Sequence, residues 1–395
     1  MKIALVHDDF VQAGGAESLF ATIASLWPNA PIYTSLVDWH KLPQSISRDR
    51  IRPSFIQKIP FATKFYKVLL PLYPLAFESF NFDDFDVVIS STTRFAKSII
   101  TKPKTVHICY INSLPRFLWS EQIQQDYLSS IVRLILKPFL AWLKKWDLAS
   151  SFRVDHYLAN SQNIASQLKQ HYTHQGEVIY PFADLNFFKI AKIHNWKLKS
   201  QNYYLVVSRL VKWKKIDIAI QAAQALKINL KIVGTGPDEA RLKRLASHFV
   251  IPAKAGIQNH SSKSWIPNQV RDDRGVKIEF LGKVTKEKLR ELYQNSRALI
   301  VTQQEDFGIA AVEAGACGAP VIGYQASGVS EIIENDKTGI LFPSQSPMSI
   351  QDAINRQTKV KWTVSACRQI ALKYSKDNFV RQLREKVRFY GKRGK

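Results

Sequence analysis

The feature that most constrains this chain is a repeated alternation of short apolar runs with longer amphipathic stretches. This pattern is typical of parallel β-sheets whose strands are joined by helices. It occurs in two series, the first beginning near residue 3 and the second near residue 203. A length of 395 residues is too great for one typical domain and about right for two. The sequence therefore predicts an α/β fold of two doubly wound domains.

The two series predict elements in a regular order. In the first series we expect strands at 3–6, 31–35, 86–90, 106–111, 156–159 and 177–180, and helices at 16–27, 128–145 and 162–171. In the second we expect strands at 203–208, 230–233, 277–281, 298–302, 320–323 and 339–342, and helices at 215–226, 239–248, 286–296, 308–317 and 330–334.

The domain boundary falls in a polar, basic stretch at residues 182–200. We predict a first domain at 1–185, a second at 186–374 and a basic amphipathic helix at 375–395, for which Ser375 is a plausible N-cap. The segment 251–274 has no clean period, and so long a loop inside a compact domain is unusual. We interpret it as an inserted surface loop.

Charge and cysteine content limit the class of protein. The net charge of +24 favours anionic partners such as nucleic acid, anionic lipid or phosphorylated substrates, without choosing among them. Three scattered cysteines, Cys109, Cys317 and Cys367, form no CxxC pair, which argues against a zinc site or a disulfide framework. A basic nucleic-acid-binding protein is the alternative that this charge suggests, but the sequence has no zinc-finger or RNA-recognition signature.

The apolar runs also bear on location. The run at the N-terminus is too short for a signal peptide, and no stretch reaches the roughly 18 apolar residues of a spanning helix. We therefore expect a cytoplasmic protein that is peripheral on the inner face of the plasma membrane or not attached to it. The stretch 52–80 places cations beside aromatic residues, which suits an anionic membrane surface as well as it suits plain packing.

Glycines follow two predicted strands. Gly14 and Gly15 open the first predicted helix, where a glycine turn lets the backbone approach an anion, although many α/β proteins carry a glycine there. Gly234 and Gly236 follow a strand of the second series and predict a tight loop near a nucleotide. The third glycine of the dinucleotide fingerprint is missing, so we expect no nicotinamide cofactor. We also expect no other cofactor.

Two basic residues leave the first strand of the second series. Arg209 and Lys214 stand at the carboxyl end of that strand, where open α/β sheets bind ligands. They could hold a diphosphate and neutralise charge as it leaves, or they could simply form a solvated start of a helix.

The most informative stretch runs from Glu305 to Glu313. It joins a predicted strand to a helix whose N-terminus, at Phe307, Gly308 and Ile309, would point backbone N–H groups at a phosphate. Glu313 lies along that helix and could accept hydrogen bonds from two ribose hydroxyls, and Glu305 could contact a sugar. The structural alternative is a capping acid followed by a surface glutamate. An Asp-x-Asp at 84–86 is interpreted as a strand-start turn, so no metal site is predicted.

These motifs, in this order, resemble glycosyltransferase family 4, whose members are retaining enzymes of the GT-B fold. The resemblance rests on Ser208-Arg209-Leu210 with Lys214, Val233-Gly234-Thr235-Gly236-Pro237, Phe280-Leu281-Gly282, Glu305 to Glu313, Gly318-Ala319-Pro320-Val321-Ile322 and Gly328-Val329-Ser330-Glu331. The first domain looks like the mannosyltransferase-like branch, on Pro71-Leu72-Tyr73-Pro74, Asp86-Val87-Val88-Ile89-Ser90-Ser91 with Ala96-Lys97, and His107-Ile108-Cys109-Tyr110.

The resemblance implies two Rossmann-like domains facing a cleft, with the C-terminal helix packing back on the first domain. It implies that Glu313 holds ribose, that Arg209 and Lys214 hold diphosphate, and that Glu305 lies near the sugar. The donor would be a nucleotide diphosphate-sugar, a GDP- or UDP-sugar with GDP-mannose as the first guess, used without a metal. The acceptor would be a glycan or a lipid-linked saccharide for envelope polysaccharide.

The chain departs from the family on the acceptor side. Many relatives carry a histidine at the position of Asn112, and an amide can hydrogen-bond a hydroxyl but cannot shuttle a proton. Asn112 and Arg116 are therefore candidates for binding an acceptor. The departure leaves open a catalytically silent relative that still binds the nucleotide-sugar.

Overall fold

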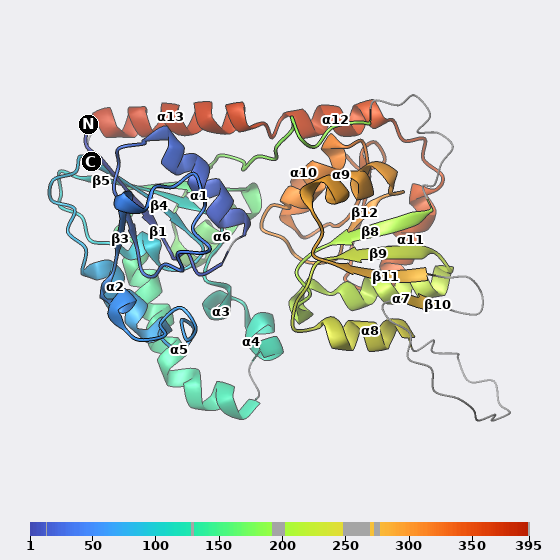
Figure 1. Ribbon diagram of the computed structural model, residues 1–395, viewed down its shortest axis with the longest axis horizontal. Helices are drawn as coiled ribbons and strands as arrows, with labels where there is room; N and C mark the ends of the chain where they lie inside the picture. Colours follow the sequence, from blue (N-terminus) through green and yellow to red (C-terminus); the bar gives the residue numbers. More distant parts are fainter. Residues whose placement is uncertain (13, 128–129, 192–201, 248–268, 272–276, 394–395) are drawn as a thin grey trace. The chain divides into compact units, whose positions relative to one another are not determined.

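The computed structural model describes residues 1–12, 14–127, 130–191, 202–247, 269–271 and 277–393. The chain divides into two compact units (Figure 1). Unit 1 comprises Met1–Phe182 and Lys376–Lys395, and unit 2 comprises Ala183–Ser375. The chain therefore crosses between the units twice, close to residues 182 and 375.

Unit 1 is built on a parallel sheet of seven strands in the order β3-β2-β1-β4-β5-β6-β7. The strands are β1 (Ile3–His7), β2 (Ile32–Thr34), β3 (Ile51–Pro53), β4 (Val87–Thr92), β5 (Val106–Ile111), β6 (His156–Ala159) and β7 (Gly176–Val178). Every residue of β1, β4 and β5 is buried, as expected for parallel strands that are covered on both faces.

The helices of unit 1 cover both faces of this sheet (Figure 1). They are α1 (Gly15–Leu26), α2 (Tyr73–Glu78), α3 (Arg116–Trp119), α4 (Glu121–Tyr127), α5 (Ser130–Ser151), α6 (Gln162–Tyr172) and α13 (Lys376–Arg393). Alternate residues of β1 point to opposite faces, so Leu5 packs in the cluster beneath α1 and α13 while Val6 packs in the cluster beneath α2 and α5.

The C-terminal helix α13 belongs to unit 1, which confirms the predicted packing. Phe379, Leu383 and Val387 recur at intervals of four residues, so they form one apolar face of the helix. All three side chains are buried in the cluster that contains Leu5 of β1.

Unit 2 carries a second sheet, in the order β10-β11-β9-β8-β12-β13-β14. Its strands are β8 (Tyr203–Val207), β9 (Asn229–Val233), β10 (Gln269–Arg271), β11 (Lys277–Gly282), β12 (Leu299–Val301), β13 (Val321–Tyr324) and β14 (Gly339–Phe342). All pairs are parallel except β10 with β11 at the edge.

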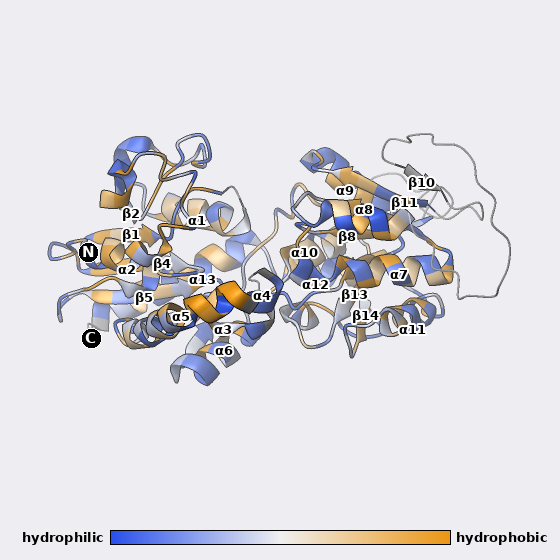
Figure 2. Ribbon diagram, turned by 90° about the horizontal axis from the view of Figure 1, so that it is seen from below, coloured by the Kyte–Doolittle hydropathy of each residue, from blue (hydrophilic) through white to orange (hydrophobic). Residues whose placement is uncertain are grey.

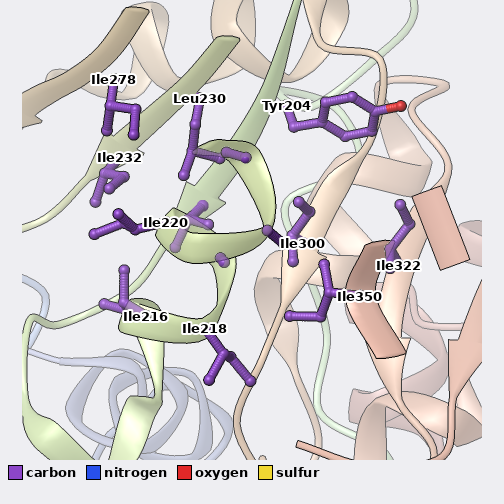
Figure 3. Close-up of a cluster of buried hydrophobic side chains, with 14 of the residues drawn as sticks. Tyr204, Ile216, Ile218, Ile220, Leu230, Ile232, Ile278, Ile300, Ile322 and Ile350 are labelled. Atoms are coloured by element: carbon purple, nitrogen blue, oxygen red, sulfur yellow. The ribbon is translucent and has the colours of Figure 1, made fainter. Parts of the chain in front are cut away.

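The helices of unit 2 follow its strands along the chain. They are α7 (Ile216–Leu226), α8 (Glu239–Ser247), α9 (Lys286–Asn295), α10 (Ile309–Ala316), α11 (Pro347–Gln357) and α12 (Val364–Leu372). Figure 3 shows isoleucines of α7, Ile216, Ile218 and Ile220, among strand residues such as Ile232 and Ile300. This aliphatic cluster holds helix and sheet together, so the loops at the strand ends rest on a fixed base.

The structure confirms the two doubly wound α/β units and corrects some elements. Residues 330–334, predicted as a helix, contain only the end of a 3-10 turn at Gly328–Glu331, because Ser327 caps that short turn and Val329 is buried beneath it. Strand β3 and helices α2, α3, α4, α11 and α12 were not predicted. Of the segment 251–274, only 269–271 are among the described residues, as β10, and the rest of the predicted insertion lies outside them.

Candidate functional site

The carboxyl edge of the unit 2 sheet gathers most of the predicted residues. Strands β9, β8 and β12 are neighbours and run parallel, so the loops that follow them emerge side by side. These loops, at residues 234–238, 208–215 and 302–308, carry the glycines, the basic residues and Glu305. This is the edge where open parallel sheets bind ligands.

An ion pair joins two of these loops. Lys214 Nζ lies 2.5 Å from Glu305 Oε1, and Gln303 Nε2 donates to the same oxygen. The hydroxyl of Thr302 donates to the carbonyl oxygen of Lys214 at 2.6 Å, which ties the basic loop to the end of β12. The lysine is buried, so its charge has little water around it and the carboxylate partner stabilises it. An anionic ligand here would compete with Glu305 for the ammonium group.

Lys214 is also positioned by an aromatic ring. Its Nζ lies 4.2 Å from the centroid of the Trp213 ring, within range of a cation–π interaction. Arg209, on the same loop, is exposed at the end of β8. The structure therefore brings Lys214 and Glu305 together, and it places Arg209 on the same loop with its side chain in contact with solvent.

The glycines of the loop at 234–238 are needed for close packing of the backbone against the loop at 208–215. A Cβ atom on Gly234 would lie 1.9 Å from the carbonyl oxygen of Ser208, and one on Gly236 would lie 2.1 Å from that of Leu210. The Leu210 amide donates to the carbonyl oxygen of Thr235 at 3.0 Å. The two loops are thus fastened to each other through main chain. Direct contact of these glycines with a nucleotide stays a prediction.

The N-terminus of α10 faces the same edge because it follows β12. Gly308 is the N-cap, with φ of 107°, a left-handed conformation that favours glycine. Ile309 is the first helical residue, and Phe307 is buried against Tyr374, with ring centroids 5.2 Å apart. The cap residue has no side chain of its own to cover the first N–H groups, which suits an anion at this position.

Glu313 lies on α10 and is held by Tyr293 of α9. The phenol hydroxyl donates to Glu313 Oε2 at 3.0 Å, and Tyr293 is fully buried. Burial raises the pKa of Glu313 to about 7, although the hydrogen bond from Tyr293 and the charge of Lys286 act in the opposite direction. The carboxyl group is thus poised between its two protonation states near neutral pH. The sequence reasoning missed Tyr293, because nothing local marks a tyrosine 20 residues before its partner.

In unit 1, Gly14 and Gly15 open α1. Glu17 caps this helix start, since its Oε2 accepts from the Gly14 N–H at 2.8 Å. A carboxylate therefore already caps the start of this helix. The structure shows a role for Gly14 in the helix start, and contact with a donor stays a prediction.

The acceptor-side candidates lie after β5. The Asn112 side chain donates to Ser91 Oγ at 3.1 Å, and its backbone N–H donates to the carbonyl oxygen of Thr92 at 2.8 Å. Arg116 is the first residue of α3 and is partly exposed. Asn112 therefore joins the ends of β4 and β5, and its amide is oriented by this contact.

Sequence reasoning also missed a set of buried charges in unit 1. Asp8, directly after β1, accepts hydrogen bonds from the backbone N–H groups of Phe95 and Ala96, both at 2.8 Å. Burial opposes ionisation, but Arg94, His7 and the amide groups outweigh it and hold the pKa of Asp8 below its ordinary value. The signal was the placement of two acids immediately after an apolar strand.

The next residue along the chain after Ala96 takes part in a buried ion pair. Lys97 and Asp147 form an ion pair with both side chains fully buried. Asp147 Oδ2 also accepts from Trp119 Nε1 at 2.8 Å and from the Tyr172 hydroxyl at 2.5 Å. The carboxylate is therefore fully used in structural contacts.

Comparison with known proteins gives a family match in unit 2. Residues 188–273 and 272–371 match the family described as glycosyl transferases group 1, which covers most of unit 2. An uncharacterized glycosyltransferase of Methanocaldococcus jannaschii is 23% identical over 74% of this chain and 69% of its own length. An alpha-1,3/1,6-mannosyltransferase of Candida glabrata is 24% identical over 93% of this chain and 82% of its own.

Other curated relatives match over a smaller share. A D-inositol 3-phosphate glycosyltransferase of Mycobacteroides abscessus is 25% identical over 51% of this chain, which spans only 43% of that protein. Among solved structures, HepE of Anabaena in complex with UDP and glucose aligns over 99% of this chain and 100% of its own, with a TM-score of 0.65 and 17% identity. The described fold is that of the GT-B enzymes. Together, the matches show the GT-B fold and a similarity of this chain to group 1 glycosyltransferases.

Proposed function

We propose that this protein transfers a hexose from a nucleotide diphosphate-sugar, with retention of the anomeric configuration, to a glycan or lipid-linked acceptor. The observation that carries the proposal is the grouping of Lys214, Glu305 and the N-terminus of α10 at one edge of the unit 2 sheet. A cation and a helix N-terminus are complementary to a diphosphate, and a carboxylate is complementary to sugar hydroxyls.

The residues have distinct roles in this proposal. Arg209 and Lys214 bind the diphosphate and stabilise the charge that develops as it leaves. Gly308 and Ile309 present backbone N–H groups to the same phosphates, and Glu313 accepts hydrogen bonds from the ribose. Glu305 orients Lys214 and contacts the sugar. The departing phosphate oxygen takes the proton of the attacking hydroxyl, so a histidine base at the position of Asn112 is not required.

The donor sugar and base are the finer part of the proposal. The mannosyltransferase from Candida glabrata is consistent with GDP-mannose, and the solved HepE complex holds UDP and glucose. We propose GDP-mannose first and a UDP-hexose second, both used without a metal and on the cytoplasmic side of the membrane. The acceptor is proposed to be a lipid-linked saccharide of the cell envelope.

Product analysis tests the proposal. The purified protein is incubated with GDP-mannose or UDP-glucose and a lipid-linked saccharide, with and without EDTA, and the product's anomeric configuration is read by NMR. Retained configuration, unaffected by EDTA, is expected. Inverted configuration would contradict the retaining mechanism, and a requirement for Mg²⁺ would contradict the metal-free one. Tight donor binding with no turnover would identify a catalytically silent relative.

A further inference from the structure

Helix α5 of unit 1 has one face that is packed and one that is not. Its second half is anchored in the unit by Leu143 and Asp147, which are fully buried. Its first half exposes large aliphatic side chains: Ile131 is 73% exposed, Leu134 71% and Ile135 70%. In Figure 2 this part of α5 is among the most strongly hydrophobic segments of the ribbon.

The exposed side chains fall on one face of the helix. Ile131, Leu134 and Ile135 are spaced by three and four residues, and Trp142, which is half exposed, continues the same line seven residues later. We call these four residues the α5 stripe. A single exposed leucine needs no explanation, but a stripe of four large apolar residues at helical spacing indicates a binding surface.

Cations accompany the stripe. Arg133, Lys137 and Lys144 share the neighbouring face by the same periodicity, and Lys145 lies beside Trp142. The sequence from 130 to 146 contains no aspartate or glutamate. The surface around the stripe is therefore positively charged.

A second segment of unit 1 has the same chemistry. The sequence from 52 to 77 also contains no acidic residue, and it exposes Phe61, Phe65 and Val68 among lysines. Other residues of this segment and of the second half of α5 pack into one hydrophobic cluster: Ile59, Tyr66, Leu69, Phe139, Leu140 and Trp146. The segment and the helix thus cover the same face of the unit 1 sheet.

The combination selects one class of partner. Nucleic acid would use the cations but leave the aliphatic side chains exposed, and a neutral apolar partner would use the stripe but leave the cations unpaired. A bilayer of anionic phospholipid accommodates both, because an amphipathic helix lies in its interface with apolar residues inserted and Lys and Arg at the headgroups. Among the described residues no helix is long and apolar enough to cross a membrane.

We propose that unit 1 binds anionic phospholipid bilayers through the α5 stripe and its flanking cations, with the exposed aromatic residues of 52–77 as a second point of contact. This surface extends the membrane contact that the sequence predicted for residues 52–80 alone. It does not rest on the proposed sugar transfer, because lipid binding needs no donor.

Vesicle flotation tests the proposal. The full-length protein is mixed with vesicles of phosphatidylcholine alone or with roughly 30% phosphatidylglycerol, and the fraction that floats is measured. We expect binding to the anionic vesicles only. The double variant Leu134→Ser/Ile135→Ser should weaken binding by about tenfold or more. The matched control is Met348→Ser on α11 of unit 2, where an equally exposed apolar residue (71%) is removed and no effect is expected.

Charge variants separate the two contributions. Arg133→Gln/Lys137→Gln should weaken binding to anionic vesicles by about fivefold for each cation removed, and added salt should weaken wild-type binding in the same way. Lys359→Gln/Lys361→Gln, two exposed lysines of unit 2, should change nothing. Thermal unfolding and nucleotide affinity of each variant, measured in parallel, show that the fold and the donor site are intact.

Three results would overturn the proposal. The first is a wild-type protein that does not float with anionic vesicles. The second is flotation that the stripe variants leave unchanged. The third is a wild-type dimer that the stripe variants convert to a monomer without any vesicle binding, because the stripe would then be an interface between copies of the chain.

Discussion

The two units use their buried charges in opposite ways. In unit 1, Lys97 and Asp147 are fully buried and paired with each other, and the carboxylate is surrounded by protein donors. In unit 2, Lys214 and Glu305 are paired across two loops while Arg209 is exposed nearby. The charges of this pair in unit 1 thus stabilise the packing of α5, whereas the charges in unit 2 stand where a ligand can exchange with a protein partner.

The largest expected effect is on the free energy of unfolding, when the buried ion pair of unit 1 is broken. Lys97→Met should lower the free energy of unfolding of unit 1 by about 3–5 kcal/mol, because it leaves the Asp147 carboxylate buried without its counter-ion. Urea denaturation followed by tryptophan fluorescence measures it. Lys102→Met, which removes an exposed partner of Asp83, should cost less than about 1 kcal/mol. Equal losses would show that the buried pair is not structural.

Replacing the paired lysine of unit 2 should reduce activity rather than stability. Lys214→Met should lower the rate of sugar transfer by about 100- to 1000-fold, the usual cost of losing one group that stabilises developing charge. Initial rates at saturating donor measure it, with thermal unfolding as the check on the fold. Lys212→Met, an exposed lysine of the same turn, is the control. A rate within about twofold of wild type would remove Lys214 from the chemistry.

A further prediction concerns the backbone of the loop at 234–238 in unit 2. Gly234→Ala should destabilise unit 2 by about 2–4 kcal/mol, because the new Cβ would collide with the Ser208 carbonyl oxygen at a φ of 128°. Gly282→Ala is the matched control, since its φ of 63° is also left-handed but no atom lies within 4 Å of the added Cβ. That variant should cost about 1–2 kcal/mol. Equal effects would mean that strain, not close packing, explains both glycines.

The smallest expected effect concerns proton linkage at Glu313. If the carboxylate form binds ribose, nucleotide affinity should rise with pH through about 7. Tyr293→Phe removes a hydrogen bond that lowers the pKa of Glu313, so the midpoint should move to higher pH and affinity at pH 7 should fall by about fivefold. Calorimetric titration at several pH values measures both. Tyr203→Phe, which loses a bond to the carbonyl oxygen of Leu292, should not move the midpoint.

The same pKa shift has a consequence for stability. Glu313 binds its proton more tightly in the folded protein than in the unfolded chain. The folded state therefore holds more protons between the ordinary pKa of 4.5 and the raised value of about 7. From this group alone, stability decreases as pH rises through that window.

The sequence was sufficient for features that depend on local pattern. The strands Val106–Ile111 and Gly339–Phe342 were predicted to the residue, because each is a short apolar run between turn residues. The basic loop with Lys214 and the Glu305 stretch were placed at one edge, because both follow parallel strands of one sheet. Features that are set by hydrophobic periodicity and strand order can therefore be predicted from the sequence.

Contacts between residues that are far apart in the sequence could not be predicted. The Lys97–Asp147 pair joins residues 50 positions apart, and the local sequence around either residue does not indicate its partner. The Tyr293–Glu313 contact joins two helices whose packing is set by the whole unit. The short strand Ile51–Pro53 was missed because it owes its conformation to pairing with β2 rather than to its own composition.

The most direct test of the account is calorimetric titration of the full chain with GDP-mannose and UDP-glucose, for the wild type and for Glu313→Ala. We predict that at least one donor binds and that Glu313→Ala weakens that binding by about tenfold or more, while Glu287→Ala on the surface of α9 leaves it unchanged. Absence of binding by any nucleotide-sugar, or equal affinity in the wild type and Glu313→Ala, would contradict a donor site at this edge of unit 2.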